Sequence, residues 1–296
     1  MEDVFPYPVA HIGLIGGGQL GRMLVKAAKS LGCTCVVLDP VPGSPAGQLA
    51  GNQIVGDYSD PAMLRALAES CDVVTFELED IETETLGELE AQGHKVFPRP
   101  ELLAVIQDKF LQKQFLRRSG IPTSDFADMP RPYAEGFGAF GFPLVQKARR
   151  GGYDGRGVLV MRDAAAFADH LPVPGFVERF VEAEKELAVL VARNVGGECR
   201  AYPTVEMRFR ATDNVLDFLV APARIPAEIA RRAEALAIRT VEAMSGVGVF
   251  GIEMFLTASG ELLVNEVAPR THNSGHHTIE ACVTDQFEQH LRAILG

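Results

Sequence analysis

The stretch GVFGIEMFLTASGELLVNEVAPR, residues 248–270, decides the fold because it has the pattern of a β-hairpin. Residues 249–256 and 262–267 are rich in β-branched, aromatic and aliphatic side chains, and Ser259 and Gly260 between them are typical of a two-residue turn. A two-residue turn fixes the register of the hairpin, because the residue numbers of every opposed pair then add up to the same value. This register places Glu253 opposite Glu266. Opposed residues of an antiparallel pair have Cβ atoms about 5 Å apart, so the two carboxyl groups would be close together.

This pair of carboxylates is the first candidate for a functional site. Two carboxylates at such a distance repel each other by roughly 3 kcal/mol at an effective dielectric near 20, and a cation between them removes the repulsion. Mg²⁺ prefers oxygen ligands, usually takes one or two protein carboxylates, and completes its shell with substrate phosphates. The pair therefore predicts a magnesium site, and the alternative is two exposed glutamates on an ordinary hairpin.

The composition of the chain limits its class. Its 296 residues are enough for two domains, 47% of them are hydrophobic, and no apolar run approaches the length that spans a membrane. The formal net charge of −11 argues against nucleic acid as a partner. The start MEDVFPYPVA has no signal-peptide pattern, and the five cysteines show no metal or disulfide framework. We therefore expect a cytoplasmic enzyme with no membrane and no nucleic-acid partner.

A glycine turn opens the first α/β segment. Residues 11–15 have the pattern of a strand, GGGQLG at 16–21 fits G-x-G-x-x-G, residues 20–31 form an amphipathic helix, and Asp39 follows the next strand. Backbone N–H groups at a helix N-terminus can bind an anion. That anion can be the pyrophosphate of a dinucleotide or the phosphate of a nucleotide-like substrate, and glycines that serve only helix–strand packing are the third interpretation.

Further α/β units continue to about residue 97 and predict a parallel sheet. Glu77 follows the strand at 71–76, at the carboxyl end where ligands collect in open parallel sheets. Glu77, Glu79 and Asp80 can equally form a solvated acidic loop.

The middle of the chain carries a basic glycine loop. Residues 108–120 predict a helix on which Lys109 and Lys113 lie one turn apart, a spacing typical of any solvated face. The segment KARRGGYDGRG at 147–157 then joins two predicted strands, and its glycines and cations can cover phosphates. It lacks the G-K-[ST] of a P-loop. We interpret it as a flap, with a basic surface hairpin as the alternative.

The segment after the hairpin, THNSGHH, contains His272 and His276 four residues apart. This spacing can bind zinc on a helix. The residues between them favour a loop, so we prefer a hydrogen-bonding substrate loop.

The order of these features resembles that of the ATP-grasp superfamily. Four motifs, GGGQLGRM (16–23), KARRGGYDGRG (147–157), GVFGIEMF (248–255) and NEVAPRTHNSGHHTIEAC (265–282), look like those of the biotin-independent carboxylase family of purine synthesis. The resemblance implies an α/β chain with an N-terminal Rossmann-like parallel-sheet domain followed by a two-part ATP-grasp domain of α+β type. Residues 1–105 would form the first domain, 106–175 a small lid subdomain with the flap, and 176–296 the large subdomain. Relatives usually continue well past the end of this chain, so we expect the C-terminal segment to be truncated.

What the resemblance implies for function is a ligase that carboxylates 5-aminoimidazole ribonucleotide. ATP would phosphorylate bicarbonate, the carboxyl group would pass to the exocyclic amine, and ADP and phosphate would leave. The implied cofactors are ATP and Mg²⁺ without biotin, the implied partners are the two substrates and ATP, and the family is commonly homodimeric.

The resemblance also implies roles for individual residues. For ATP it implies two lysines that contact the phosphates, a flap that covers them, a linker whose backbone binds the adenine, an acid that binds the ribose, and the end of the hairpin. These residues are Lys109, Lys147, Gly152, Tyr153, Asp154, Gly155, Arg156, Gly157, Val158, Glu178, Arg179, Phe180, Val181, Glu186, Asn265 and Glu266. Those for the ribonucleotide and bicarbonate are Gly18, Gln19, Leu20, Glu77, Tyr153, Arg156, His272 and Asn273. Glu253 and Glu266 would hold Mg²⁺, and Arg270 would act with them in catalysis.

Three other functions stay open at this point. One is a nicotinamide-dependent oxidoreductase that uses GGGQLG and Asp39. The second is an ATP-grasp nucleotide-binding module that has lost catalysis. The third is a different ATP-grasp ligase, such as a biotin carboxylase or a formate-using ribonucleotide transformylase.

Overall fold

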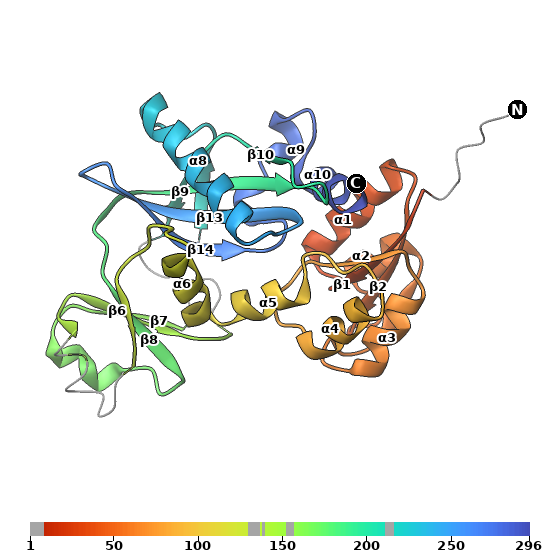
Figure 1. The fold of residues 1–296 in the computed structure, drawn as a ribbon, viewed down its shortest axis with the longest axis horizontal. Coiled ribbons are helices and arrows are strands. Elements are labelled where there is room, and N and C mark those ends of the chain that lie inside the picture. The colour runs from red at the N-terminus through yellow and green to blue at the C-terminus, as the bar shows by residue number, and fades with distance from the viewer. Residues whose placement is uncertain (1–8, 130–136, 138–139, 152–156, 211–215) are drawn as a thin grey trace, which may run out of the picture.

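The computed structural model describes the chain except for residues 1–8, 130–136, 138–139, 152–156 and 211–215. The described residues form three sheets with helices packed around them (Figure 1). The predicted α/β class is confirmed.

The first domain has a parallel sheet of strand order β3-β2-β1-β4. Its elements alternate along the chain: β1 (His11–Ile15), α1 (Gln19–Ser30), β2 (Thr34–Asp39), α2 (Pro45–Ala50), β3 (Gln53–Val55), α3 (Pro61–Glu69), β4 (Val73–Phe76) and α4 (Thr83–Ala91). All of them except α2 are predicted from the sequence. Strands β1, β2 and β4 are almost wholly buried because helices cover both faces of the sheet, whereas the edge strand β3 is partly exposed. The predicted Rossmann-like domain is confirmed.

Several helices begin at side chains that accept backbone N–H groups. Asp60 precedes α3 and accepts from Ala62, and Asp108 precedes α6 (Lys109–Arg118) and accepts from Phe110. Such caps satisfy N–H groups that have no partner inside the helix. The cap at Asp108 fixes where α6 begins and therefore where Lys109 stands.

A second sheet, which also has four strands and which we call the small sheet, lies at the lower left of Figure 1, below α6. Its order is β5-β8-β6-β7 and all of its pairs are antiparallel. Its strands are β5 (Phe126–Asp128), β6 (Leu144–Ala148), β7 (Val158–Met161) and β8 (Gly175–Arg179), with the 3-10 helix η1 (Ala164–Asp169) between the last two. Helix α5 (Pro100–Gln107) and α6 connect the first domain to this sheet.

The third sheet is the largest and has the order β12-β11-β9-β13-β14, with β10 paired to β9. Its elements are β9 (Ala183–Arg193), β10 (Cys199–Ala201), β11 (Val205–Phe209), β12 (Leu216–Val220), β13 (Gly248–Thr257) and β14 (Leu262–Ala268). One face packs on α8 (Ala227–Ala243), α5 and α6 through a core that includes Val189, Phe250, Ile252, Met254 and Val264. The alternate residues, among them Glu186 and Glu253, point to the other face, because side chains alternate along a strand.

The hairpin β13–β14 confirms that Glu253 pairs with Glu266, although the predicted two-residue turn is wrong. The Thr257 N–H donates to the Glu261 carbonyl at 3.0 Å, so the loop has three residues, and Gly260 takes a φ of +79° there. This loop shifts the nearby pairs by one residue. A β-bulge that contains Asn265 then restores the predicted register at the two glutamates.

The end of the chain returns to the first domain. After the short helices η2 (Asn273–Gly275) and α9 (Thr278–Ala281), helix α10 (Gln286–Leu295) packs beside α1 (Figure 1). Phe287, Leu291 and Ile294 are buried in one cluster with Leu14 and Leu24 of the first domain. The last helix therefore ties the largest sheet to the first domain.

Candidate active site

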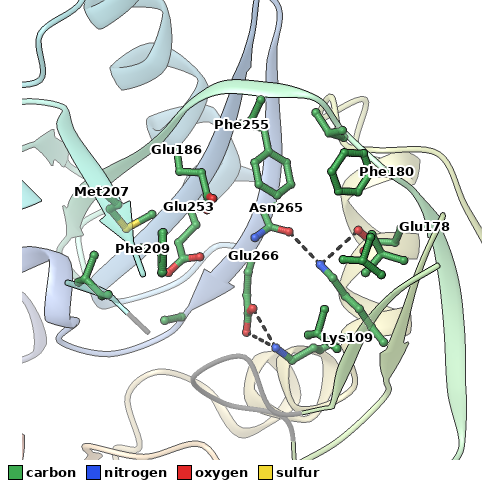
Figure 2. A pocket seen from close by; sticks show the side chains of 18 of the residues that line it. Lys109, Glu178, Phe180, Glu186, Met207, Phe209, Glu253, Phe255, Asn265 and Glu266 are labelled. Atoms are coloured by element: carbon green, nitrogen blue, oxygen red, sulfur yellow. Dashed lines mark hydrogen bonds and ion pairs between the residues drawn. The ribbon is translucent and has the colours of Figure 1, made fainter. Parts of the chain in front are cut away.

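A cavity of about 510 Å³ lies between the small sheet and the largest sheet. Strands β6, β7 and β8 line it from one side, and β9, β11, β13 and β14 line it from the other. Figure 2 shows Phe180 and Phe255 in its upper part, which we call the apolar end, and the Lys109–Glu266 pair in its lower part, which we call the charged end; Glu186 and Glu253 lie between them, beside Met207 and Phe209. A molecule with an apolar ring and an anionic tail fits such a cavity.

Of the opposed glutamates, Glu266 stands at the charged end of the cavity and Glu253 stands next to it. Burial, together with the nearby carboxylate of Glu266, raises the pKa of Glu253 to about 7. Burial acts in the same direction on Glu266, but Lys109 outweighs it and holds the pKa of Glu266 below its usual value. The predicted electrostatic conflict between the two carboxylates is thus present, and Lys109 relieves it on one side only.

Lys109 is the first residue of α6 and bridges to the hairpin. Its Nζ donates to both carboxylate oxygens of Glu266, each at 2.8 Å. The base of the predicted flap is tied to the same place, because the Arg149 guanidinium pairs with Asp108 at 2.7 Å and the Lys109 N–H donates to the Arg149 carbonyl at 2.8 Å. The helix start, the flap base and the glutamate pair therefore form one connected unit.

Lys147 of β6 is the second lysine of the cavity. Its Nζ donates to Asn265 Oδ1 at 2.9 Å and forms an ion pair with Glu178 Oε2 at 3.2 Å. Asn265 reaches this face together with Glu266 because of the β-bulge, whereas strict alternation would have placed it on the other face. The structure thus brings together Lys109, Lys147, Asn265 and Glu266, as the resemblance implied.

Glu178 and Lys113 differ from their predicted settings. Lys113 is 2% exposed, so the solvated face predicted for it is wrong. Like Phe110 and Leu116 it is a buried residue of α6, and its Nζ donates to the Val264 carbonyl of β14 and forms an ion pair with Glu178 Oε1 at 3.2 Å. The Glu178 side chain holds two lysines, a role that a linker read through its backbone does not include.

The loop after β14 brings Arg270, His272 and Asn273 to the charged end of the cavity. The Arg270 Nε lies 2.8 Å from Glu79 Oε1, and His272 Nε2 lies 3.4 Å from Glu253 Oε1. Burial and then Arg270 lower the pKa of His272 to about 4, so its ring is neutral. Glu79, one of the acids of the predicted acidic loop, reaches this cavity from the first domain.

The sequence does not predict most of the apolar lining of the cavity. Beyond the predicted Phe180 and Val181, apolar side chains of the lining come from β6, β7, β11, β12 and β13, namely Val145, Val160, Met207, Phe209, Leu216 and Phe255. The predicted Glu186 also lines the cavity, and burial raises its pKa. Alternating apolar residues in strands signal only burial, so nothing in the pattern distinguished a cavity wall from a core.

The glycine turn at the start of α1 binds the protein's own carboxylates. The N–H groups of Gly18 and Gly21 donate to Glu77, and the Gly17 N–H donates to Asp39 at 2.7 Å. Burial raises the pKa of Glu77 despite these hydrogen bonds. Gly18, Gln19, Leu20 and Glu77 do not line the cavity, and a substrate phosphate at this turn would have to displace Glu77.

Asp39 is buried, and both of its carboxylate oxygens accept hydrogen bonds from the protein itself. Besides Gly17, it accepts from the Val41 N–H and the Tyr58 hydroxyl, each at 2.8 Å. Asp39, the acid that would bind the ribose of a dinucleotide, therefore links the glycine turn to the loop after β2 instead. This geometry argues against the oxidoreductase interpretation.

Part of the predicted flap lies outside the described residues, namely Gly152, Tyr153, Asp154, Gly155 and Arg156. Of the rest, Val158 lines the cavity, and the Gly157 carbonyl accepts from the Ala148 N–H at 2.7 Å. Both residues therefore stand at the start of β7, next to the residues that the structure does not describe.

The donor set at the glutamate pair fits Mg²⁺. Glu253, Glu266 and Asn265 supply hard oxygen atoms, and the raised pKa of Glu253 records a repulsion that a divalent cation would remove. Within the described ranges, no group of three or more His, Cys, Asp or Glu side chains can hold a metal by itself. A metal that is completed by nucleotide phosphates needs only two carboxylates. The zinc alternative has no support, since it needs both histidines on one α-helix, and His272 and His276 instead flank the three-residue 3-10 helix η2.

Comparisons with known proteins agree with this geometry. The model of the ribonucleotide synthetase preATP-grasp domain matches residues 9–107, and that of the ATP-grasp domain matches residues 114–287. The N5-carboxyaminoimidazole ribonucleotide synthase of Synechococcus elongatus is 43% identical over 300 residues, which are 99% of this chain and 75% of that protein.

The described residues include no helix that is long and apolar enough to cross a membrane.

One further relative and one solved structure complete the comparison. The phosphoribosylaminoimidazole carboxylase of Ogataea methanolica is 43% identical over 295 residues, or 96% of this chain. The N5-carboxyaminoimidazole synthase of Aspergillus clavatus, solved with ADP and 5-aminoimidazole ribonucleotide, has a TM-score of 0.90 and 36% identity over 97% of this chain and 76% of that one. The chain spans about half the length of the first curated relatives it matches, 54% in the case of the Ogataea protein.

Proposed function

The chain belongs to the ATP-grasp superfamily, in the family of N5-carboxyaminoimidazole ribonucleotide synthases, and we propose that it carboxylates 5-aminoimidazole ribonucleotide with ATP and bicarbonate. The products would be N5-carboxyaminoimidazole ribonucleotide, ADP and phosphate. One observation carries the proposal. The opposed pair Glu253 and Glu266 faces Lys109 and Lys147 at the charged end of a cavity whose other end is apolar.

The cavity offers a place for each part of ATP. The adenine ring would lie between Phe180, Met207 and Phe255, and Glu186 would accept from the ribose hydroxyls. Lys109 and Lys147 would meet the phosphates, and the chain between β6 and β7 would cover them. Cations over a phosphate chain suit phosphoryl transfer, since little covalent work by the protein is needed. Mg²⁺, when bound by Glu253 and Glu266, would neutralise charge on the phosphates.

Arg270, His272 and Asn273 stand where the second half of the reaction would occur. The Arg270 guanidinium is suited to hold bicarbonate and the carboxyl group that follows from it, because its fork of N–H groups matches a planar anion. Neutral His272 accepts the Ser274 N–H at Nδ1 and therefore carries its proton on Nε2, so it can donate a hydrogen bond to an oxygen of the carboxyl group that is transferred. Exclusion of water by the flap would protect carboxyphosphate from hydrolysis.

The ribonucleotide would bind at the side of the cavity that faces the first domain. Glu77 is held by two backbone N–H groups and Glu79 by Arg270, so both carboxylates have fixed positions at the edge of the parallel sheet. We propose that Gly18, Gln19, Leu20 and Glu77, with Tyr153 and Arg156 of the flap, bind this substrate.

The test is phosphate release from ATP. We expect release that needs both bicarbonate and 5-aminoimidazole ribonucleotide, and loss of release in Glu266→Gln with the fold retained. Release that needs formate, or biotin as acceptor, would identify a different ATP-grasp ligase. Calorimetry that found NAD(H) binding without ATP binding would refute the proposal. The resemblance also leads us to propose a cytoplasmic homodimer that uses no biotin, and light scattering during size-exclusion chromatography tests the dimer.

A further inference from the structure

We infer that Lys113 is a positioning residue for the nucleotide, because it shares the buried carboxylate of Glu178 with Lys147 and so keeps Lys147 available to the phosphates. The inference rests on the proposed binding of ATP in this cavity. None of the roles implied by the family resemblance involves Lys113.

Lys113 is built into the protein rather than attached to its surface. Its side chain is 3% exposed, and its Nζ donates to Thr123 Oγ1 at 2.7 Å, to Ser124 Oγ at 3.1 Å and to the Val264 carbonyl at 3.4 Å. A buried ammonium is retained only where such partners replace water. These contacts join α6, the segment before β5, and β14, so the position of Nζ is fixed by three parts of the chain.

Glu178 is the common partner of the two lysines. Its side chain is also 3% exposed, with Oε1 3.2 Å from Lys113 and Oε2 3.2 Å from Lys147. The Ser124 hydroxyl donates to Oε2 at 3.1 Å. Lys147, at the edge of the cavity, also donates to Asn265. Only Lys147 of the two lysines lines the cavity, so the buried carboxylate connects a hidden cation to an accessible one.

The charge balance gives Lys113 its function. Two lysines and one glutamate leave one net positive charge, and that charge is presented to the cavity by Lys147. Without the Lys113 ammonium, Glu178 would be neutralised by Lys147 alone. The local charge would fall to zero, and Lys147 would be drawn away from the phosphates toward Glu178. Burial lowers the pKa of Lys113 to about 8 against the opposing effect of Glu178, which still leaves it protonated at neutral pH.

The experiment compares Lys113→Met with the double variant Lys113→Met/Glu178→Gln. Calorimetry measures the affinity for ADP with Mg²⁺, and phosphate release measures KM for ATP and kcat. We expect Lys113→Met to weaken ADP binding and to raise KM for ATP about tenfold, with a smaller change in kcat. Removing the Glu178 charge as well should restore most of the affinity. Arg118→Met, an exposed cation on the same helix, is the matched control and should bind as the wild type does.

The alternative is that Lys113 only supports the fold. In that case Lys113→Met would lower thermal stability and leave the affinity of the folded protein unchanged, or the double variant would bind more weakly than the single one, and either result would overturn the inference. Should Lys113→Met not fold, Glu178→Gln decides alone, because it keeps both lysine charges. We expect it to bind ADP at least as tightly as the wild type, and a loss of more than about threefold would contradict us. Wild-type protein that binds ADP but carboxylates nothing would refute the proposed function while leaving this test intact.

Discussion

Replacing Glu253 with glutamine should make the ligand-free protein more stable while removing its activity. Glutamine has nearly the same shape as glutamate, so the substitution removes one charge from the opposed pair without opening a cavity. Glu253 is chosen because Lys109 pairs with Glu266, whereas the neighbour of Glu253 is His272, which its lowered pKa keeps neutral. The charge of Glu253 is thus the poorly compensated one.

The pKa shift gives the size of the effect. The rise of the Glu253 pKa from 4.5 to about 7 corresponds to about 3 kcal/mol of free energy. Burial of the charge is the largest cause of this rise, and repulsion from Glu266 adds to it. Because the folded pKa exceeds the unfolded value, the native state binds more protons between pH 4.5 and 7, and wild-type stability falls as the pH rises through this window. Glu253→Gln lacks this loss.

Urea unfolding at pH 8 and at pH 4.5, without nucleotide or metal, measures the effect. We expect Glu253→Gln to exceed the wild type by about 2–3 kcal/mol at pH 8 and to be close to it at pH 4.5. Glu261→Gln, an exposed residue near the turn of the same hairpin, is the matched control and should show no difference. If Glu253→Gln were as stable as the wild type at pH 8, the two carboxylates would not be in conflict and the reasoning about the site would fail.

Three other predictions concern residues around this pair and the domain contact. Lys109→Met should destabilise the ligand-free protein by about 1–2 kcal/mol in urea unfolding, since a largely buried hydrogen-bonded charge is lost, and adding Glu266→Gln should recover most of this loss. His290 is buried and neutral, and burial lowers its pKa to about 4. The folded protein therefore loses stability as the pH falls from 6.5 toward 4, because the unfolded chain binds the proton first. Between pH 7 and pH 5 the wild type should lose about 2 kcal/mol that His290→Gln does not lose, and equal slopes would contradict the assignment. Phe287→Ala should cost about 3–5 kcal/mol, measured by urea unfolding, because Phe287 fills the core shared by α10 and the first domain.

The fold could be predicted where patterns are local. The alternation of strands and helices through β4 and α4 and the pairing of Glu253 with Glu266 were confirmed, whereas the last predicted strand, near residue 97, is reduced to a single bridge between Val74 and Val96. The predicted two-residue turn of the hairpin was wrong. The predicted pairing of the two glutamates was still correct, because the bulge at Asn265 compensates for the extra loop residue. Bulges have no reliable sequence signal, so the position of Asn265 on the same face as Glu266 could not be predicted.

The site could be predicted only in part, because burial depends on packing between segments far apart in the chain. Lys113 was assigned to a solvated face from its spacing with Lys109. A signal was present, since Phe110, Lys113 and Leu116 stand three residues apart on one helix face and a lysine in such a stripe needs a buried partner. That partner, Glu178, lies 65 residues further along the chain, at a distance no local pattern reveals.

The acids of the first domain give the same lesson. Asp39 and Glu77 have the spacing of ligand-binding residues, yet both carboxylates accept the N–H groups of the glycine turn. The sequence shows that an anion belongs at such a turn. It does not show whether the anion is a ligand or a side chain of the protein.

The most direct test of the central claim is the binding of a divalent cation in the presence of nucleotide. Mn²⁺ also prefers oxygen ligands, and its electron paramagnetic resonance signal reports the free ion. In the presence of ADP, the wild type should bind Mn²⁺ at least about tenfold more tightly than Glu253→Gln or Glu266→Gln does. Equal binding by all three proteins would show that the opposed glutamates do not hold the metal.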